Sequence, residues 1–178
     1  MLKMGSLYSF NVSGTRVLFN PVFTNIIYEI SDSDKIEAKY SVNIEQKNVI
    51  KKMGKETTTH DYLNLLNTNN YYFFDGESVS TDNFLYFNIQ HGGDCYYSKK
   101  TGKLFYGRSV RLNANTTNIL SINKPITSKD NFFVSIILPY RLLEILPARK
   151  LNEDLKRLVT NLKEEDNPIL FFYSLKSL

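Results

Sequence analysis

The sequence predicts an all-β fold, a partial β-propeller of about three blades with an amphipathic helix before its last strand. Three observations carry this prediction. Short apolar and aromatic runs alternate with polar residues at period two, as strands with one buried face do. Clusters of Gly, Asn, Asp and Ser separate these runs at close spacing. The pattern of four runs joined by short turns occurs twice, and such four-stranded meanders form propeller blades.

The first predicted blade spans residues 6–44. Its strands are expected at 7–12, 16–19, 25–30 and 36–44. The last run has an apolar residue at every second position from Ile36 to Ile44, which predicts a strand with one buried face. The polar residues 45–70 then form a long connection, expected to be flexible, in which residues 61–66 predict a short helix capped by Thr59 or Asp61.

The second predicted blade spans residues 70–112. Its strands are expected at 71–74, 84–89, 95–97 and 104–106. Asp75-Gly76 is a dipeptide typical of tight hairpins, and it predicts a turn directly after the first of these strands. Gly92-Gly93 and the segment 99–103, which has a glycine at its turn, predict the remaining hairpins.

The third predicted blade, residues 117–178, is incomplete. Residues 119–122 and 132–138 are strand-like, and 140–146 predict a short helix between two prolines. A second helix is expected to begin at the N-cap Asn152 and to end before Pro168, with a final strand at 169–175. We expect the apolar stripe of this helix to pack across the end of the last blade; the stripe comprises Leu151, Leu155, Leu158, Val159 and Leu162.

Length and composition favour one domain, residues 1–178, without a transmembrane segment. The longest apolar run, 132–139, is far shorter than the roughly twenty residues that a spanning helix needs. The net charge of +4 includes basic clusters at 47–55 and 99–111. Nucleic-acid binding is the weaker alternative for the second cluster, because interleaved aromatic residues and lysines are also typical of a half-buried strand pair. No nucleic-acid partner is therefore expected.

No motif in the sequence predicts a catalytic residue, a metal ligand or a cofactor. His91 and Cys95 are close in sequence, but a hairpin turn places them on opposite strands, and a lone cysteine is usually a small buried apolar residue. His60 lies far from both, in the polar connection. Asp32, Asp34 and Glu37 lack the glycine and the spacing of a calcium loop, so they predict a turn. The single cysteine also excludes an intrachain disulfide.

Acidic residues of the second blade leave one enzymatic alternative open. A glycan-directed enzyme would need two carboxylates that face each other roughly 5 to 10 Å apart. The second blade offers four acidic residues: Asp75, Glu77, Asp82 and Asp94. The sequence does not place them relative to one another. The leading hypothesis is therefore a non-enzymatic binding or scaffold module, with its ligand, a protein or a glycan, at one mouth of the central channel where loops converge.

Three segments carry a resemblance to a known family. Residues 162–176 (LKEEDNPILFFYSLK) are similar to the C-terminus of six-bladed β-propeller lipoproteins of Bacteroidetes. The Tyr-x-Ile step in residues 25–30 and the hairpin at 97–103 also resemble that family. The similarity extends over nearly the whole chain and corresponds to the C-terminal half of a family member. It implies location at the cell envelope, in the periplasm or at the outer-membrane surface.

Two departures from the family shape the expectations for this chain. Family members are about twice as long and begin with a lipoprotein signal, whereas Cys95 lies mid-chain and cannot be the lipidated residue. Half of a propeller leaves two apolar blade faces uncovered, because closure of the ring is what removes such exposed surfaces. The chain is thus expected either to form a homodimer through these open faces or to be part of a longer protein.

Overall fold

The protein is described by a computed structural model, and the predicted all-β fold is confirmed. Strands dominate the described part of the chain, and every strand pair is antiparallel. The described residues are 8–13, 16–21, 24–31, 35–45, 58, 60–61, 64–65, 71–107, 110–111, 121–122, 124–145 and 153–176.

Two four-stranded sheets form meanders in which each strand pairs with its neighbours in sequence. The first sheet contains β1 (Tyr8–Ser13), β2 (Arg16–Pro21), β3 (Ile26–Ile30) and β4 (Ile36–Ser41). The middle sheet contains β5 (Phe73–Ser80), β6 (Phe84–Gln90), β7 (Gly93–Ser98) and β8 (Leu104–Gly107). These are the strand order and the length expected of propeller blades.

The third sheet is smaller and is followed by two helices. It contains β11 (Thr127–Lys129), β12 (Phe132–Ile137) and β13 (Ile169–Tyr173). The existence of the two predicted helices between β12 and β13 is confirmed, as α2 (Pro139–Ile145) and α3 (Glu153–Thr160). The predicted end of the second helix, just before Pro168, is wrong, because α3 ends at Thr160. A short pair, β9 (Val110–Arg111) and β10 (Ser121–Ile122), precedes this sheet. Within the described residues, no helix is long and apolar enough to cross a membrane.

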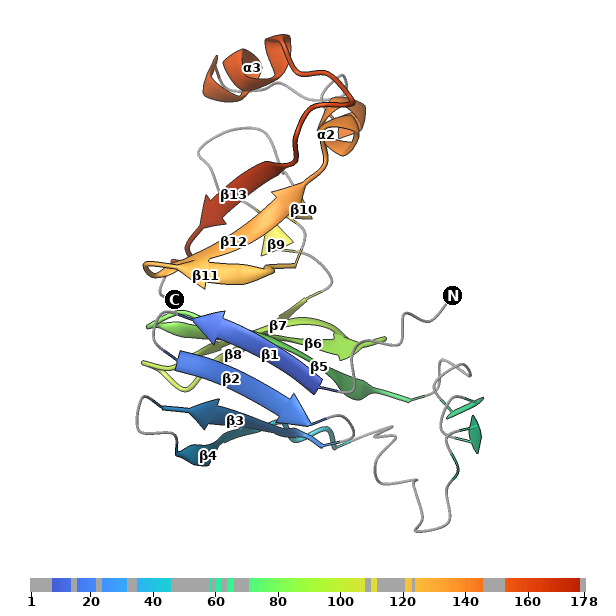
Figure 1. The fold of residues 1–178 in the computed structure, drawn as a ribbon, viewed down its shortest axis with the longest axis vertical. Helices are drawn as coiled ribbons and strands as arrows, with labels where there is room; N and C mark the ends of the chain where they lie inside the picture. Colours follow the sequence, from blue (N-terminus) through green and yellow to red (C-terminus); the bar gives the residue numbers. More distant parts are fainter. Residues whose placement is uncertain are drawn as a thin grey trace.

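The first strands of the three larger sheets converge. β1 and β11 lie on the sides of their sheets that face each other, while β4 and β13 lie on the far sides (Figure 1). Both β1 and β11 also contact β5. Two hydrogen bonds cross between sheets here: the Asn11 amide donates to the Ile126 carbonyl, and the Ser128 hydroxyl donates to the Ser80 carbonyl, at 3.3 and 2.6 Å. The sheets therefore spread outward from a shared inner edge, which is compatible with a partial propeller.

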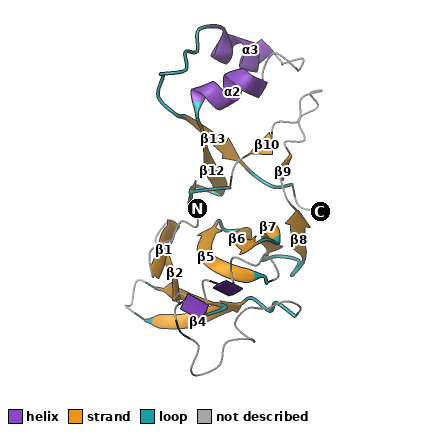
Figure 2. Cartoon of the chain, turned by 90° about the vertical axis from the view of Figure 1, so that its right-hand side faces the viewer, coloured by secondary structure: helices purple, strands orange, loops and turns teal. Residues whose placement is uncertain are grey.

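Among the described residues, two clusters of buried side chains lie one on each face of the middle sheet. Figure 2 shows the strands of the middle sheet between β4 on one side and β12 and β13 on the other. The cluster between the first and middle sheets is built around Leu18, Ile27, Leu85, Phe87 and Cys95. The cluster between the middle and third sheets is largely aromatic and comprises Val79, Phe84, Tyr86, Tyr96, Phe133 and Tyr173. Because residues alternate between the two faces of a strand, β6 and β7 contribute to both clusters.

The C-terminal helices form a small separate cluster at the end of the third sheet. Val159 and Leu162 pack against Ile137 of β12 and Leu142 of α2. These contacts confirm the expected packing of the stripe for its two described members. The predicted N-cap Asn152 and the side chains of Leu151, Leu155 and Leu158 lie outside the described residues.

The prediction of a hairpin turn at Asp75-Gly76 is wrong. Both residues lie inside β5, and the chain reverses only after Ser80, where Thr81 bonds back to Phe84. Gly76 has a φ of 87°, a conformation that favours glycine. The dipeptide therefore forms a β-bulge, in which the same left-handed geometry shifts the register without ending the strand.

The prediction that the alternate apolar residues of 36–44 all lie on one buried face is also wrong. The register shifts between Ile27 and Tyr28, so Tyr40 pairs with Ile27 whereas Ala38 pairs with Tyr28. Neighbouring residues on β3 point to opposite faces. Tyr40 accordingly packs on the core with Val42 and Ile44, while Ile36 is 61% exposed on the other face.

The connection between the first two sheets is described only at a few positions. The main-chain N–H and the hydroxyl of Thr58 both donate to Asp61, at 3.1 and 2.6 Å, and the Asp61 N–H donates to the Thr58 hydroxyl. This is a reciprocal capping arrangement, with Thr58 in the place expected for Thr59. The expected flexibility of residues 45–70 falls mostly on residues 46–57 and 66–70, which lie outside the described part.

Candidate functional site

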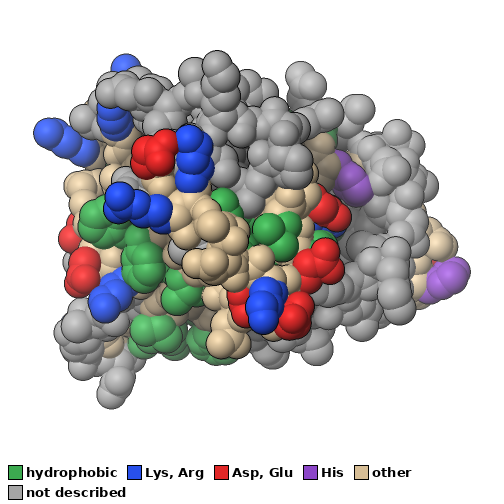
Figure 3. Space-filling model, turned by 90° about the horizontal axis from the view of Figure 1, so that it is seen from above, with side chains coloured by type: hydrophobic (Ala, Val, Ile, Leu, Met, Phe, Trp, Pro, Cys, Tyr) green, Lys and Arg blue, Asp and Glu red, His purple; other side chains and the backbone are tan. Residues whose placement is uncertain are grey.

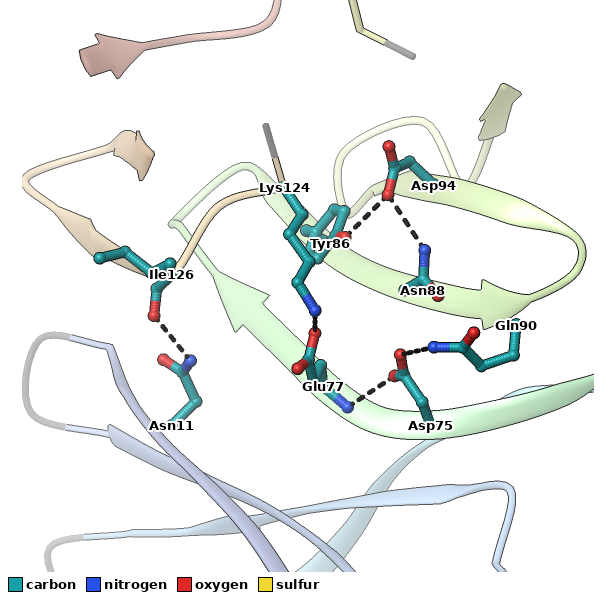
Figure 4. Close-up of polar contacts among 9 residues, drawn as sticks. All are labelled: Asn11, Asp75, Glu77, Tyr86, Asn88, Gln90, Asp94, Lys124 and Ile126. Atoms are coloured by element: carbon teal, nitrogen blue, oxygen red, sulfur yellow. Dashed lines mark hydrogen bonds and ion pairs between the residues drawn. The ribbon is translucent and has the colours of Figure 1, made fainter. Parts of the chain in front are cut away.

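A group of polar side chains surrounds the bulge of β5, on the face of the middle sheet that looks toward the third sheet (Figure 4). We call this group the bulge cluster. It contains Asp75, Glu77, Tyr86, Asn88, Gln90, Asp94 and Lys124. Its members come from β5, β6, β7 and the segment that leads into β11.

The bulge itself explains why these side chains meet. Phe74 pairs with Ile89 and Ser78 pairs with Phe87, so three residues of β5 lie opposite the single residue Asn88. The extra length lets the Asp75 carboxylate fold back and accept a hydrogen bond from the Glu77 N–H at 2.9 Å. A bulge commonly redirects side chains in this way next to functional sites.

Asp75 is the half-buried carboxyl group at the centre of the bulge cluster. Its second oxygen accepts a hydrogen bond from the Gln90 amide at 2.9 Å. Loss of solvation, together with the nearby charge of Glu77, raises the pKa of Asp75 to about 6, although the hydrogen bonds and the charge of Lys124 oppose the shift. A carboxyl group with this pKa exchanges protons near neutral pH, which is a property of many functional carboxyls.

Glu77 connects the middle sheet to the third sheet. Its carboxylate forms an ion pair with the Lys124 ammonium, and both side chains are about half exposed, at 48%. An ion pair with this much solvent contact contributes little to stability. Both charges also remain within reach of a ligand.

Asp94 is half-buried, and one of its carboxylate oxygens accepts two hydrogen bonds within the cluster. One carboxylate oxygen accepts hydrogen bonds from the Tyr86 hydroxyl at 2.8 Å and from the Asn88 amide at 3.1 Å. Burial raises the pKa of Tyr86, and the Asp94 charge adds to the shift, so the phenol stays protonated and donates. These hydrogen bonds link β6 to β7, whereas the Glu77 side chain is 48% exposed and is the accessible carboxylate of the cluster.

The structure separates the only histidine and cysteine that are close in sequence. His91 is exposed in the β6–β7 turn, and its ring lies 6.5 Å from that of Phe73. Cys95 is buried in the core between the first and middle sheets, where loss of solvation raises its thiol pKa to about 11. A thiol with that pKa is not activated as a nucleophile. His60 is exposed beside Asp61.

Two further predicted groups do not form a site. Asp82 is exposed in the β5–β6 turn, apart from the bulge cluster. In the basic segment 99–111, Lys99 donates to the Ser80 hydroxyl at 2.6 Å, which ties two hairpins together. Of the four aromatic residues among these charges, Tyr96, Tyr97 and Phe105 pack on the two core clusters and so do not form a stacking platform for bases. Tyr106 is 64% exposed, and its hydroxyl donates to the Gly92 carbonyl.

No metal centre is present among the described residues, where no three His, Cys, Asp or Glu side chains gather closely enough to hold an ion. Of the acidic residues weighed as a calcium loop, Asp32 and Asp34 lie outside the described part. Glu37 is exposed on β4, opposite Glu29.

Sequence reasoning identified the acidic members of the bulge cluster but missed their partners. Asn88 and Gln90 lie two residues apart on β6, where polar residues interrupt an otherwise apolar strand. This interruption was the sequence signal that could have identified them. Lys124 lies more than thirty residues further along the chain, and only the packing of the third sheet brings it to Glu77.

Comparison with known proteins adds one structural likeness. No protein-family model matches the chain, and no protein of curated function matches it significantly in sequence. The fold matches the crystal structure of a protein from Bacteroides fragilis that is described as exported, with a TM-score of 0.64 and 20% sequence identity. The match covers 94% of this chain and 49% of that protein. The chain thus shares the fold of about half of that longer protein.

Proposed function

We propose that the chain is a non-enzymatic binding or scaffold module whose ligand contacts the bulge cluster. The observation that carries the proposal is the position of Asp75: a half-buried carboxyl at a bulge, beside the inner edge where three sheets converge. Ligand sites usually combine a few fixed polar groups of this kind, and Gln90 and Glu77 hold Asp75 in place. Carboxylate and amide groups side by side suit a ligand rich in hydroxyl groups, such as a glycan.

The test is a titration of the isotope-labelled protein with a panel of neutral mono- and oligosaccharides, followed by NMR. We expect chemical-shift changes centred on residues 75–77 and 88–90, and loss of these changes in Asp75→Ala. Asp82→Ala is the matched control, because Asp82 is an exposed acid of the same sheet outside the cluster. If no sugar shifts the cluster resonances, a glycan ligand is excluded. A polypeptide ligand would then be sought at the same residues.

A glycan-directed enzyme is the second candidate, and the shifted pKa of Asp75 favours it. At neutral pH a carboxyl with a pKa of about 6 retains part of its proton, while Glu77 sits beside the Lys124 cation. Two carboxyls in such unlike surroundings are a common basis for acid and base roles. Hydrolysis of aryl glycosides that is lost in both Asp75→Asn and Glu77→Gln would support this candidate.

We further propose that the module acts at the cell envelope and is related to the Bacteroidetes lipoproteins that its terminal segment resembles. The support is the structural likeness to a Bacteroides protein that is described as exported and has about twice the length. Fractionation of cells that produce the native protein tests the location. Recovery in the cytoplasm alone would overturn it, whereas an upstream coding region with a lipidated cysteine would strengthen the family relation.

A further inference from the structure

Two sheet faces of this protein carry exposed apolar side chains, and both point away from the middle sheet. On the first sheet, Phe10, Val12 and Ile36 are each about 60% exposed. They share this face with a cross-strand ladder in which the Phe10 and Phe19 rings stack at 4.8 Å. We call this the β1–β4 face. On the third sheet, Phe132, Leu170 and Phe172 are 44, 54 and 52% exposed, and we call their surface the β12–β13 face.

These faces have the composition of surfaces that are covered elsewhere in the same molecule. The opposite face of the first sheet places Leu18 and Ile27 against the middle sheet, at 1 and 0% exposure. The opposite face of β12–β13 places Phe133 and Tyr173 against the middle sheet in the same way. Contiguous exposed apolar surface on a soluble protein usually marks an interaction site. Figure 3, seen from the end that carries α2 and α3, shows hydrophobic side chains grouped between charged ones.

We propose that a second copy of this chain covers both faces, with the β1–β4 face of each copy packed on the β12–β13 face of the other. A two-fold rotation about the shared inner edge then forms two identical junctions and closes the assembly. The two copies bring six of the larger sheets, three from each. This inference concerns surfaces away from the bulge cluster and does not depend on the proposed ligand.

Two observations select a second copy over an unrelated partner. First, a partner must offer two different apolar faces at the correct angle, and another copy has both by construction. Second, the same fold is found as about half of a chain of roughly double length, so the three-sheet unit occurs with further structure joined to it. β1, β5 and β11 contact one another, so the three sheets share one inner edge about which the second copy is placed.

The experiment measures molar mass by light scattering and sedimentation over a wide range of protein concentrations. We expect the chain to have a mass of about 41 kDa, twice the 20.7 kDa of one chain. Val12→Lys on the β1–β4 face and Leu170→Lys on the β12–β13 face should each shift the protein to monomer. Leu104→Lys is the matched control, since Leu104 is 55% exposed on β8 of the middle sheet and should leave the mass unchanged.

Mixing the two variants separates this arrangement from other dimers. Each variant alone has a charge in both junctions, whereas a mixed pair retains one junction without a charge. We therefore expect the mixture to form heterodimers more strongly than either variant forms homodimers. Circular dichroism of each variant verifies that its strands are intact.

A wild-type chain that stays monomeric at the highest concentration would overturn the proposal. So would a dimer that survives Leu170→Lys but not Val12→Lys, because that result indicates two β1–β4 faces packed on each other. If the chain stays monomeric but still binds a ligand at the bulge cluster, the dimer is excluded while the proposed function stands. The two proposals can therefore fail separately.

Discussion

The middle sheet and the first sheet have the same topology but differ in their surroundings. Both are four-stranded antiparallel meanders, yet the inner strands of the middle sheet are covered on both faces, whereas the first sheet is covered on one. In β6, four of the five residues from Phe84 to Asn88 are less than 9% exposed. On β1, by contrast, Phe10 and Val12 are each 60% exposed. The same strand pattern thus serves as core or as surface, depending on what its neighbours cover.

The largest expected effect comes from removing an aromatic ring at a covered face. Phe133→Ala deletes a side chain that is 1% exposed and lies 5.4 Å from Tyr96 and 5.6 Å from Tyr173, ring to ring. We expect the free energy of unfolding to fall by about 3–5 kcal/mol. Phe10→Ala on the open face should cost less than about 1.5 kcal/mol, the contribution of its stacking on Phe19, when measured at concentrations where the chain is monomeric. Urea unfolding gives both values, and equal losses would contradict the comparison.

The second prediction concerns Asp75, the carboxyl group at the bulge of the middle sheet. Its folded-state pKa is about 6 against an ordinary value of 3.8, so between these values the folded protein holds a proton that the unfolded chain has released. Stability from this group is therefore present below pH 3.8 and is lost as pH rises toward 6. Relative to wild type, Asp75→Asn should gain about 1–3 kcal/mol between pH 4 and pH 7.

Denaturant unfolding at several pH values measures this difference directly. Asp82→Asn, an exposed acid of the same sheet, is the control and should follow the wild type throughout. A parallel pH profile for wild type and Asp75→Asn would show that the carboxyl of Asp75 is not shifted by burial.

Two glycines in turns of the middle sheet, Gly92 and Gly102, differ in the space around them. A Cβ at Gly92 would lie 2.7 Å from the Ile89 Cγ2, so Gly92→Ala should destabilise by about 1–3 kcal/mol through overpacking. At Gly102 nothing lies within 4 Å, and the φ of 70° is the main obstacle. Gly102→Ala should therefore cost about 1 kcal/mol, from backbone conformation alone. Thermal unfolding ranks the two variants, and a reversed order would refute the steric argument.

The smallest expected effect is at the buried hydrogen bond between the middle and third sheets. The hydroxyls of Tyr96 and Tyr173 lie 3.0 Å apart inside the aromatic cluster. Tyr96→Phe removes one partner, but Tyr173 keeps a hydrogen bond to Ser135, so we expect a loss of about 0.5–1.5 kcal/mol. A double-mutant cycle with Tyr173→Phe isolates the coupling between the two hydroxyl groups, because both variants keep their rings. A loss as large as that of Phe133→Ala would mean that the hydroxyl, and not ring packing, holds these sheets together.

Much of the fold could be predicted from the sequence because hairpins are local. The turn at Lys99–Lys103, the helix at Pro139–Ile145 and the last strand each have a signal within a few residues. The bulges in β5 and between β3 and β4 could not be predicted in the same way. Asp75-Gly76 has identical chemistry in a hairpin and in a bulge, and only the pairing with β6 decides between them.

The candidate site was accessible to sequence reasoning only as a set of acidic residues. Asp75, Glu77 and Asp94 could be noted as acids of one meander, but the partner of Glu77 comes from another sheet. The pKa of Asp75 likewise depends on burial, which follows from the stacking of sheets and not from its neighbours in sequence.

The meander topology also determines how such a chain can change length in evolution. Backbone pairing in the first, middle and third sheets stays within each sheet, and the described contacts between sheets are made by side chains, such as Asn11 with Ile126 and Ser128 with Ser80. Duplication or loss of one meander therefore leaves the backbone hydrogen bonds of every other sheet unchanged. Only the apolar faces of the two sheets that become neighbours must then fit each other. A chain of this architecture can therefore gain or lose one whole sheet at a time.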